Sequence, residues 1–327
     1  MAKNPLKVGI IGTGYAAQRR AEALRADTRT EPLYFTGNTE ANSQSFAQAY
    51  NLTPLDSWQK LVNHPDLDLI VLATINQDHE ILTRAALEAG KHVIVEYPLA
   101  FSAQAGQSLL DLAQKRGKLL HVEHIELLGG LHQAILDNLP SIGKVYYGRY
   151  STLMPQSPAP LRWSYNREMF GFPLIAALSR IHRWTNLFGQ VVSVSGHCQF
   201  WNADIPNFFT ACLCDTQLRF SDGMIAQITY GKGDKLWQNE RTFTLYGEQG
   251  VLFFEGETGK LIRPQETIPI EVGKRQGLFN KDTQLVLDHL FEEKPLYVTA
   301  EQSLYALKVA EGAQISSLTG KTMEIPL

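Results

Sequence analysis

Residues 7–17 have the sequence Lys-Val-Gly-Ile-Ile-Gly-Thr-Gly-Tyr-Ala-Ala. The apolar run that ends at Ile11 predicts a strand buried on both faces, as in a parallel sheet. Residues 12–17 then follow the pattern G-x-G-x-x-A, and residues 18–25 have helical character. A strand, a glycine-rich turn and a helix in this order are typical of a dinucleotide-binding site.

Each small residue of this turn has a physical reason to be there. Gly12 permits the tight turn, Gly14 lets the backbone approach a pyrophosphate, and Ala17 allows the helix to pack closely on the strand. The exposed N–H groups at the start of the helix would then face the anion. We therefore expect the following residues to bind a dinucleotide cofactor: Gly12, Thr13, Gly14, Tyr15 and Ala16.

The end of the second predicted strand, residues 33–37, bears on the choice of cofactor. A site that prefers NAD usually has an acidic residue there, which binds the ribose 2′-hydroxyl. Here the position holds Asn38, so no carboxylate repels a 2′-phosphate. Arg19 or Arg20 could reach that phosphate, or both could be solvated surface residues. We expect NADPH to be preferred to NADH, and nearby Glu40 leaves NADH open.

Strands and helices continue to alternate up to about residue 125. Further strands are predicted at 67–74, 91–96 and 119–124, with helices at 81–89 and 103–116 between them. Open α/β sheets bind ligands just past the carboxyl ends of their strands. We expect three more cofactor contacts at these positions, with loop stabilisation as an alternative role for the last: Thr74, Asn76 and Glu96.

The second half of the chain changes character. Short turns such as 221–223 and 247–250 join consecutive strand-like segments, which favours an antiparallel sheet. The predicted strands are 144–153, 190–201, 210–220, 224–231, 241–247 and 250–256, and the flanking helices are 129–139, 173–188, 279–292 and 300–318. The fold class is therefore α/β, with an N-terminal Rossmann domain (1–125) and a C-terminal α+β domain (126–327) built on a large, mostly antiparallel open sheet.

The composition excludes several classes of protein. Hydrophobic residues make up 44% of the chain and charged residues 19%, which is typical of a globular protein. The net charge of −3 supplies no basic field for nucleic acid. The longest apolar run, 69–75, is too short to cross a membrane, and no signal-peptide pattern precedes the first strand. We expect a cytoplasmic protein with reduced cysteines.

The sequence predicts no metal site. His121 and His124 are three residues apart in a predicted strand, so their side chains point to opposite faces. Cys212 and Cys214 lack the spacing and the partners of a zinc site.

Two segments of the first half carry a family resemblance. Gly12-Thr13-Gly14 and the run from Gly90 into Glu96-Tyr97-Pro98 resemble the glucose–fructose oxidoreductase and inositol dehydrogenase family. That family typically has Glu-Lys-Pro at the latter position, and its lysine is catalytic. Tyr97 replaces the lysine here, and Glu-Tyr-Pro is found in the biliverdin reductases of the same family.

Three longer segments are similar to biliverdin reductases of the cyanobacterial type: 120–128, Phe170–Pro173 with Ser179–Ile181, and Lys281-Asp282. The resemblance extends over essentially the whole chain. It implies that NADPH or NADH gives a hydride to C10 of biliverdin IXα, the bridge between the two central pyrrole rings, and that a pyrrole nitrogen takes a proton. Bilirubin, a bilin of heme degradation, would be the product.

The resemblance also implies site residues, each with an alternative. Tyr97, beside the expected nicotinamide, would contact cofactor and substrate and donate a proton, or it merely walls the pocket. Arg180, on an apolar predicted helix, would donate to pyrrole or propionate groups, or it forms a salt bridge. Asp282 would pair with Arg180 or a pyrrole N–H, or it occupies the start of a helix. Glu126 and Arg183 are further candidate substrate contacts, with a surface position as the alternative for Arg183.

Two other functions stay open at this stage. The chain could be a sugar or polyol oxidoreductase of the wider family, although Tyr97 in place of lysine argues against it. It could also be a non-catalytic sensor of NADPH or bilin. The expected partner is the small molecule biliverdin, with no nucleic acid, no membrane and no metal, and the chain is expected to be a monomer or a weak homo-oligomer.

Overall fold

The computed structural model describes residues 4–326, which form two compact units. The first unit contains the chain up to Ile125 together with Gly277–Leu304, and the second contains Glu126–Gln276 and the chain from Tyr305 onward. The predicted division into 1–125 and 126–327 stays a prediction, but Gly277–Leu304 packs with the first unit. The reason is hydrophobic burial, since Val286 of this segment lies in the core of the first unit.

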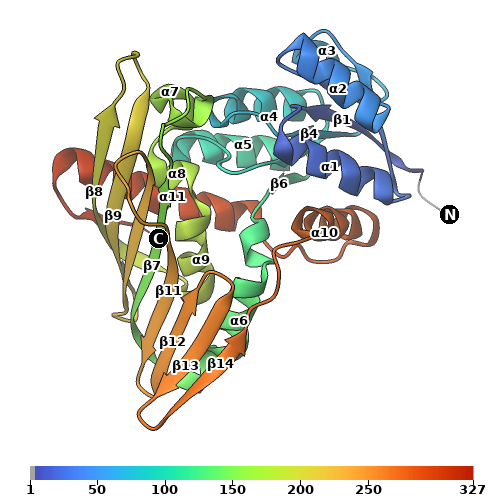
Figure 1. Ribbon diagram of the computed structural model, residues 1–327. Helices are drawn as coiled ribbons and strands as arrows, with labels where there is room; N and C mark the ends of the chain where they lie inside the picture. Colours follow the sequence, from blue (N-terminus) through green and yellow to red (C-terminus); the bar gives the residue numbers. More distant parts are fainter. Residues whose placement is uncertain (1–3, 327) are drawn as a thin grey trace. The chain divides into compact units, whose positions relative to one another are not determined.

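The first unit alternates strands and helices, as predicted (Figure 1). Its elements are β1 (Leu6–Ile11), α1 (Tyr15–Ala26), β2 (Thr30–Thr36), α2 (Glu40–Tyr50), β3 (Thr53–Pro54), α3 (Trp58–Val62), β4 (Leu69–Leu72), α4 (His79–Glu88), β5 (His92–Val95), α5 (Ala103–Arg116), β6 (Leu120–Val122), α10 (Leu278–Glu292) and the start of α11 (Ala300–Thr319). The strands form one parallel sheet in the order β3-β2-β1-β4-β5-β6. This is the order of a doubly wound dinucleotide-binding sheet, which changes direction between β1 and β4.

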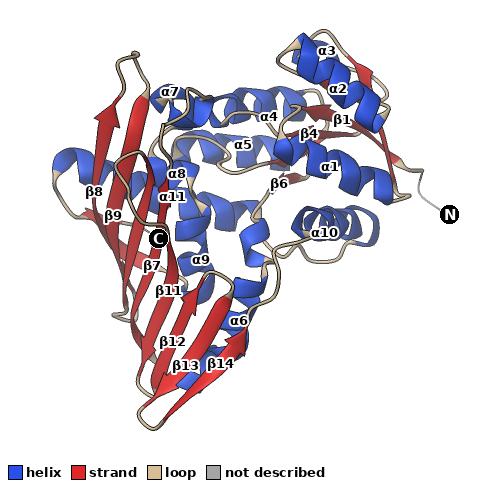
Figure 2. Ribbon diagram, viewed as in Figure 1, coloured by secondary structure: helices blue, strands red, loops and turns tan. Residues whose placement is uncertain are grey.

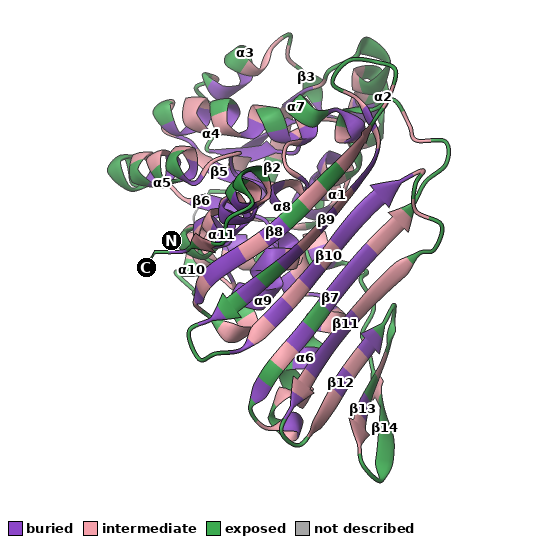
Figure 3. Cartoon of the chain, turned by 90° about the vertical axis from the view of Figure 1, so that its left-hand side faces the viewer, coloured by how far each residue is buried: buried purple, intermediate pink, exposed green. Residues whose placement is uncertain are grey.

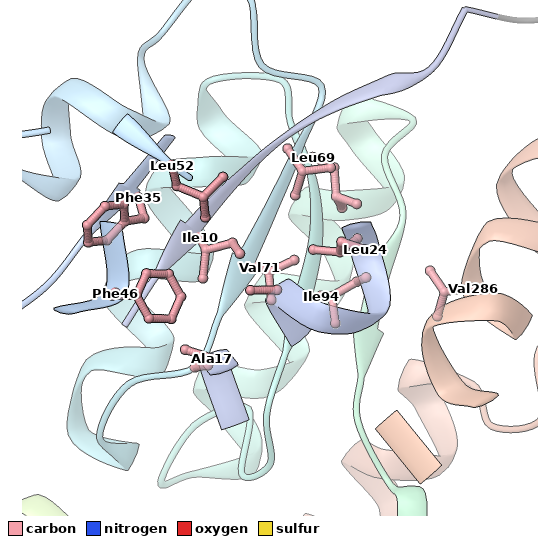
Figure 4. Packing of buried hydrophobic residues seen from close by; sticks show 13 residues of the cluster. Ile10, Ala17, Leu24, Phe35, Phe46, Leu52, Leu69, Val71, Ile94 and Val286 are labelled. Carbon is pink, nitrogen blue, oxygen red and sulfur yellow. The ribbon is translucent and has the colours of Figure 1, made fainter. Parts of the chain in front are cut away.

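Apolar side chains from neighbouring strands and two helices make the core of this unit. Ile10, Val71 and Ile94 come from β1, β4 and β5, which pair in register. Figure 4 shows them together with Leu24 of α1 and Val286 of α10. β1, β4 and β5 are largely buried, which explains why their sequences are almost continuously apolar.

The second unit is built on a nine-stranded sheet (Figure 2). Its elements are α6 (Gly130–Asn138), β7 (Val145–Pro155), α7 (Arg167–Phe170), α8 (Pro173–Ala176), α9 (Ser179–Phe188), β8 (Val191–Asn202), β9 (Phe209–Phe220), β10 (Ile225–Gly233), β11 (Glu240–Gly247), β12 (Gly250–Glu255), β13 (Thr258–Arg263), β14 (Glu266–Glu271), the rest of α11 and β15 (Met323–Glu324). The strand order is β14-β13-β12-β11-β7-β10-β9-β8-β15. The described pairs are antiparallel apart from β7 with β10, so the predicted mostly antiparallel sheet is confirmed.

One face of this sheet packs against helices. Buried and more exposed residues alternate along β9, which is visible as bands of colour in Figure 3. Helix α9 contributes the fully buried Trp184, whose ring stacks on Phe243 of β11 with 4.8 Å between the ring centres. The predicted helix 173–188 is interrupted, because Ala177 leaves the helical conformation between α8 and α9.

The sequence analysis missed the two-residue strands β3 and β15 and the longer strands β13 and β14. β13 and β14 form an outer hairpin of the sheet, and most residues of β14 are exposed. Both runs have only six residues, and Pro269 within β14 argues against a strand there, so the strand signal is weak. Of the residues that the structure describes, no helix is long and apolar enough to cross a membrane.

Lys232 of β10 is a buried cation surrounded by aromatic rings. Its ammonium group lies 3.5 Å from the ring centre of Phe170, 4.6 Å from that of Tyr165 and 5.4 Å from that of Phe209. It also donates a hydrogen bond to the backbone carbonyl of Ser164. Burial lowers the pKa of Lys232 from 10.5 to about 7.

The free energy of unfolding should therefore depend on pH through Lys232. Between pH 7 and 10.5 the unfolded chain binds the proton more tightly than the folded chain, so raising the pH favours folding. We expect the stability of the wild type, relative to Lys232→Met, to rise by about 1.4 kcal/mol per pH unit in this range. Denaturant melts at pH 7, 8 and 9 measure this difference. Lys235→Met, at a neighbouring exposed position, is the control, and parallel pH dependences of wild type and Lys232→Met would contradict the prediction.

Candidate active site

The turn after β1 has the backbone that a pyrophosphate requires. Gly12 has a φ of 120°, and a Cβ there would lie 2.2 Å from the carbonyl oxygen of Ala73, so only glycine fits. A Cβ at Gly14 would meet nothing within 4 Å, and no described side chain caps the start of α1 there. The open helix start presents N–H donors and partial positive charge. These residues fit the phosphates of a dinucleotide.

The other predicted cofactor residues of the first half follow strands of the same parallel sheet, so they share its carboxyl edge. Asn38 is exposed after β2, Thr74 is half-buried after β4, and Glu96 directly follows β5. Asn76 is buried in the turn that leads to α4. In the glycine-rich turn Thr13 and Ala16 are half-buried, and Tyr15 is 71% exposed.

The sequence left two positions open for Arg20, a contact to the 2′-phosphate and a solvated surface position, and the structure shows neither. It is completely buried, and its guanidinium group donates to Glu96 from Nε at 3.0 Å and to Asp282 from Nη1. Burial opposes its charge, but Asp282, Glu96 and Glu123 outweigh this cost and raise the pKa of Arg20. Arg20 is thus neither a surface residue nor a phosphate ligand, whereas Arg19 is partly exposed and pairs with Glu22.

Asp282 lies inside α10 and has no exposed surface. Its Oδ2 accepts from Arg20, and its Oδ1 is 2.8 Å from Nε2 of His121 and 2.6 Å from the hydroxyl of Tyr297. Burial raises the pKa of the Asp282 carboxyl. The charges of Arg20 and His121 and the hydrogen bonds lower this pKa by a larger amount, so the carboxyl stays ionised. Its place in the second turn of α10 and these partners differ from the partners expected from the sequence, Arg180 or a pyrrole N–H.

Glu123 follows β6 and is 2% exposed. Its Oε1 accepts from the backbone N–H of Ile125, and its carboxyl is hydrogen-bonded to Glu96. Burial, and then the charge of Glu96, raise the pKa of Glu123 well above its usual range. The first unit therefore holds two neighbouring carboxyl groups, of which the inner one favours the protonated form.

Tyr97 lies next to this pair, immediately after Glu96. Its half-buried ring stacks on His124, with 5.3 Å between the ring centres and 6° between the planes. Nε2 of His124 is in turn 2.8 Å from the hydroxyl of Ser303. The stacking on His124 therefore restricts the orientation of the Tyr97 ring.

The second unit gathers four arginines around one carboxylate. Oε2 of Glu126 is 3.6 Å from Arg183 and 3.7 Å from Arg241, and its Oε1 accepts from Arg275. Burial raises the pKa of Glu126, but Arg275, Arg183, Arg180 and Arg241 together lower it below its usual range. We call these five residues the arginine cluster. Its formal charge is +3, so it is suited to an anionic ligand.

The arginine cluster has more buried donors than acceptors. Arg183 is 1% exposed, which excludes the surface position considered for it. Its Nε and Nη1, the Nε of Arg241 and the hydroxyl of buried Thr152 have no hydrogen-bond partner among residues 4–326. Unsatisfied buried donors cost about 1–3 kcal/mol each, so they favour a ligand rich in acceptors.

The register of the sheet explains how these residues meet. Thr152 of β7 pairs with Tyr230 of β10 on one side and with Arg241 of β11 on the other, so the three share one face. Arg180 of α9 lies over this row, with its Cζ 5.6 Å from the ring centre of Tyr230. Its Nη1 also donates to the hydroxyl of Ser179 at 2.9 Å.

The sequence analysis missed Arg241 and Arg275. Arg241 could have been found from the sequence, because it lies on the same face of β11 as the inward-facing residues Phe243 and Leu245. A charged residue on the buried face of a strand is unusual enough to suggest a site. Arg275 lies in a loop, and no pattern distinguishes it there.

The two histidines that the sequence places three residues apart do not share a ligand. His121 and His124 bind different partners, Asp282 and Ser303. Within residues 4–326 no group of three or more His, Cys, Asp or Glu side chains is arranged to hold a metal ion.

Comparisons with known proteins place these features in a family. Residues 6–124 match the oxidoreductase family with an NAD-binding Rossmann fold, and residues 138–325 match the C-terminal alpha/beta domain of the same family. The chain is 28% identical to human biliverdin reductase A over 315 residues, which covers 94% of each chain. It is 24% identical to an NADP-dependent scyllo-inositol 2-dehydrogenase of Bacillus subtilis over 97% of this chain and 95% of that one.

One solved structure is much more similar. It is biliverdin reductase from Synechocystis sp. PCC 6803 in complex with biliverdin and NADP+, with 55% identity and a TM-score of 0.95 over 96% of this chain and 99% of that one. The resemblance drawn from the sequence is therefore confirmed. The chain belongs to the oxidoreductase family that combines an NAD-binding Rossmann fold with a C-terminal alpha/beta domain, and within it is similar to biliverdin reductases over nearly its whole length.

Proposed function

We propose that this chain reduces biliverdin IXα to bilirubin with a hydride from NADPH or NADH. The observation that carries the proposal is the 55% identity, over 96% of the chain, to a biliverdin reductase whose structure holds biliverdin and NADP+. The glycine-rich turn supports the cofactor, because only glycine fits at Gly12 and the start of α1 is open.

The arginine cluster supports the substrate. Biliverdin carries two propionate groups and several carbonyl and ring-nitrogen acceptors. A cluster of formal charge +3 with unsatisfied N–H donors on Arg183 and Arg241 would bind such a molecule by charge-assisted hydrogen bonds. A neutral sugar would leave these charges uncompensated, and Tyr97 replaces the lysine of the polyol enzymes, so a sugar or polyol substrate is disfavoured.

The residues of this chain would have different roles in binding the bilin and in transferring the proton. A bound nicotinamide cofactor supplies the hydride, and the protein orients the acceptor and manages the proton. Arg180 and Arg183 would stabilise the electron density that reaches the pyrrole nitrogens. Tyr97, held against His124, would orient the substrate or donate a proton. Asp282, with no exposed surface, would act as a positioning residue that fixes Arg20, His121 and Tyr297.

One experiment tests the function and separates the alternatives. The purified chain is mixed with biliverdin and NADPH, and the visible spectrum is followed. A change from blue-green to yellow supports reduction at C10. Binding of biliverdin with no further change would favour the sensor, and oxidation of a polyol with NADP+ in place of bilin turnover would favour the wider family.

We further propose a monomer or a weakly associating chain. The outward side chains of β9 and β10 include a hydrogen-bonded polar group, in which Gln227 and Thr229 both donate to Asp215. A polar face of this kind gives little hydrophobic driving force for a permanent dimer. The cytoplasmic location expected from the sequence stays a prediction.

The cofactor preference follows from Asn38. Without a carboxylate at this position we expect a higher kcat/KM with NADPH than with NADH. Asn38→Asp should shift the ratio toward NADH, because the new charge repels the 2′-phosphate and can accept from the ribose hydroxyl. Steady-state kinetics with both cofactors measure the ratio. A wild type that already prefers NADH would rule the idea out, and Asn42→Asp, one turn into α2, controls for added charge alone.

Arg180 should matter more to turnover than Tyr97. Removal of a donor that acts in the transition state typically costs about 10²–10³ in rate, so Arg180→Ala should lower kcat by this factor while NADPH still binds. Arg180→Lys should restore activity only in part, because an ammonium group lacks the planar fork. Tyr97→Phe should lose less than about tenfold, as expected if its ring shapes the pocket, whereas a loss of about 10²–10⁴ would make its phenol the acid and contradict this ranking.

The kinetic pattern of Arg180→Ala distinguishes its roles. An unchanged kcat with a raised KM for biliverdin would make Arg180 a propionate clamp. A lower melting temperature with unchanged kinetics would make it a structural residue.

A further inference from the structure

Tyr150 of β7 is a buried phenol inside the arginine cluster. It is 2% exposed, and the Cζ of Arg183 lies 5.7 Å from its ring centre. Phe243 of β11 packs edge-on against the ring, with 5.2 Å between the centres. The ring is therefore fixed by one apolar and one cationic neighbour.

No hydrogen bond of the Tyr150 hydroxyl is found within residues 4–326, and its oxygen is not one of the fully buried atoms without a partner, so it keeps some accessible surface. It lies among the unsatisfied donors Arg183, Arg241 and Thr152. A hydroxyl that keeps accessible surface beside these donors can donate a hydrogen bond to a ligand that enters the site. A bilin has such an acceptor for the Tyr150 hydroxyl, namely the unprotonated nitrogen of one of its pyrrole rings.

We propose that Tyr150 is the proton donor to the pyrrole nitrogen when the bilin is reduced. The inference deepens the proposed function and rests on it. Hydride addition at C10 converts the methine bridge to a methylene, and the displaced electron pair of the conjugated system moves to the ring nitrogen. The nitrogen then takes the proton of Tyr150, so that the O–H bond breaks and an N–H bond forms. The tyrosinate regains its proton from water.

The charges that face Tyr150 favour this step. Burial raises the pKa of a phenol, but here the guanidinium groups of Arg183 and Arg180 on α9 lower it more, and Arg241 on β11 adds to them. Glu126 acts in the opposite direction and is outweighed. The pKa of Tyr150 therefore lies below the usual value of 10, which makes the phenol a stronger acid and stabilises the tyrosinate.

The matched pair of variants is Tyr150→Phe and Tyr147→Phe in the full chain. Tyr147 lies on the same strand but has the opposite parity, and its hydroxyl donates to Gln227 at 3.1 Å. With biliverdin and NADPH, we expect Tyr150→Phe to lower kcat by about 10²–10⁴ with little change in KM, and Tyr147→Phe to resemble the wild type. A kcat of Tyr150→Phe within about tenfold of the wild type would overturn the proposal.

The pH profile gives a readout that a merely structural role would not move. Because the acid must be protonated, kcat of the wild type should fall as the pH rises through the pKa of Tyr150. This alkaline limb should be absent in Tyr150→Phe. If that variant does not fold, 3-fluorotyrosine at position 150 should move the limb to lower pH, and an unmoved limb would overturn the proposal.

The two proposals fail in different ways. A wild type that leaves the biliverdin spectrum unchanged overturns both the function and the role of Tyr150. Reduction by the wild type and by Tyr150→Phe at similar rates overturns the role of Tyr150 alone.

Discussion

The first unit depends on the charge of Arg20. This guanidinium group has no exposed surface, and it can remain charged only because Glu96 and Asp282 bind it directly. The ion pairs join α1, the loop after β5 and α10, three segments far apart in the sequence. Removal of one partner from such a buried pair costs about 3–5 kcal/mol, since it leaves an uncompensated charge. The turn that would hold the cofactor and the loop that carries Tyr97 are therefore fixed by one cation.

Both units use buried arginine, but with opposite balances of charge. Around Arg20 the carboxyl groups are in excess, and burial together with the charge of Glu96 raises the pKa of one of them, Glu123. Around Glu126 the arginines are in excess, and the carboxylate stays ionised. In the first arrangement the charge of Arg20 is compensated by carboxyl groups of the same unit. The arginine cluster keeps an uncompensated positive charge, which an anionic ligand would neutralise.

The fold was largely predictable because its signals are local. The glycine-rich turn and the apolar strands specify the parallel sheet, and the turns between strands specify the antiparallel one. The packing of segment 277–304 with the first unit could not be predicted, since nothing in its sequence tells which core Val286 joins. The site was predictable where a residue is unusual in its context, such as Arg180 on an apolar helix. Arg20 and Tyr150 acquire their environment only through pairings distant in sequence, and a surface arginine or a core tyrosine has the same local pattern.

Both outer strands of the nine-stranded sheet bear on how the protein avoids aggregation. A sheet of this width exposes two edges with unpaired N–H and C=O groups, which can recruit strands from other molecules. At one edge β15 has only two residues. At the other, β14 contains Pro269, which has no N–H to donate, and is flanked by Glu266 and Glu271. Pro269, which weakens the strand signal of β14 in the sequence, thus also makes this edge a poorer template for strands of other molecules.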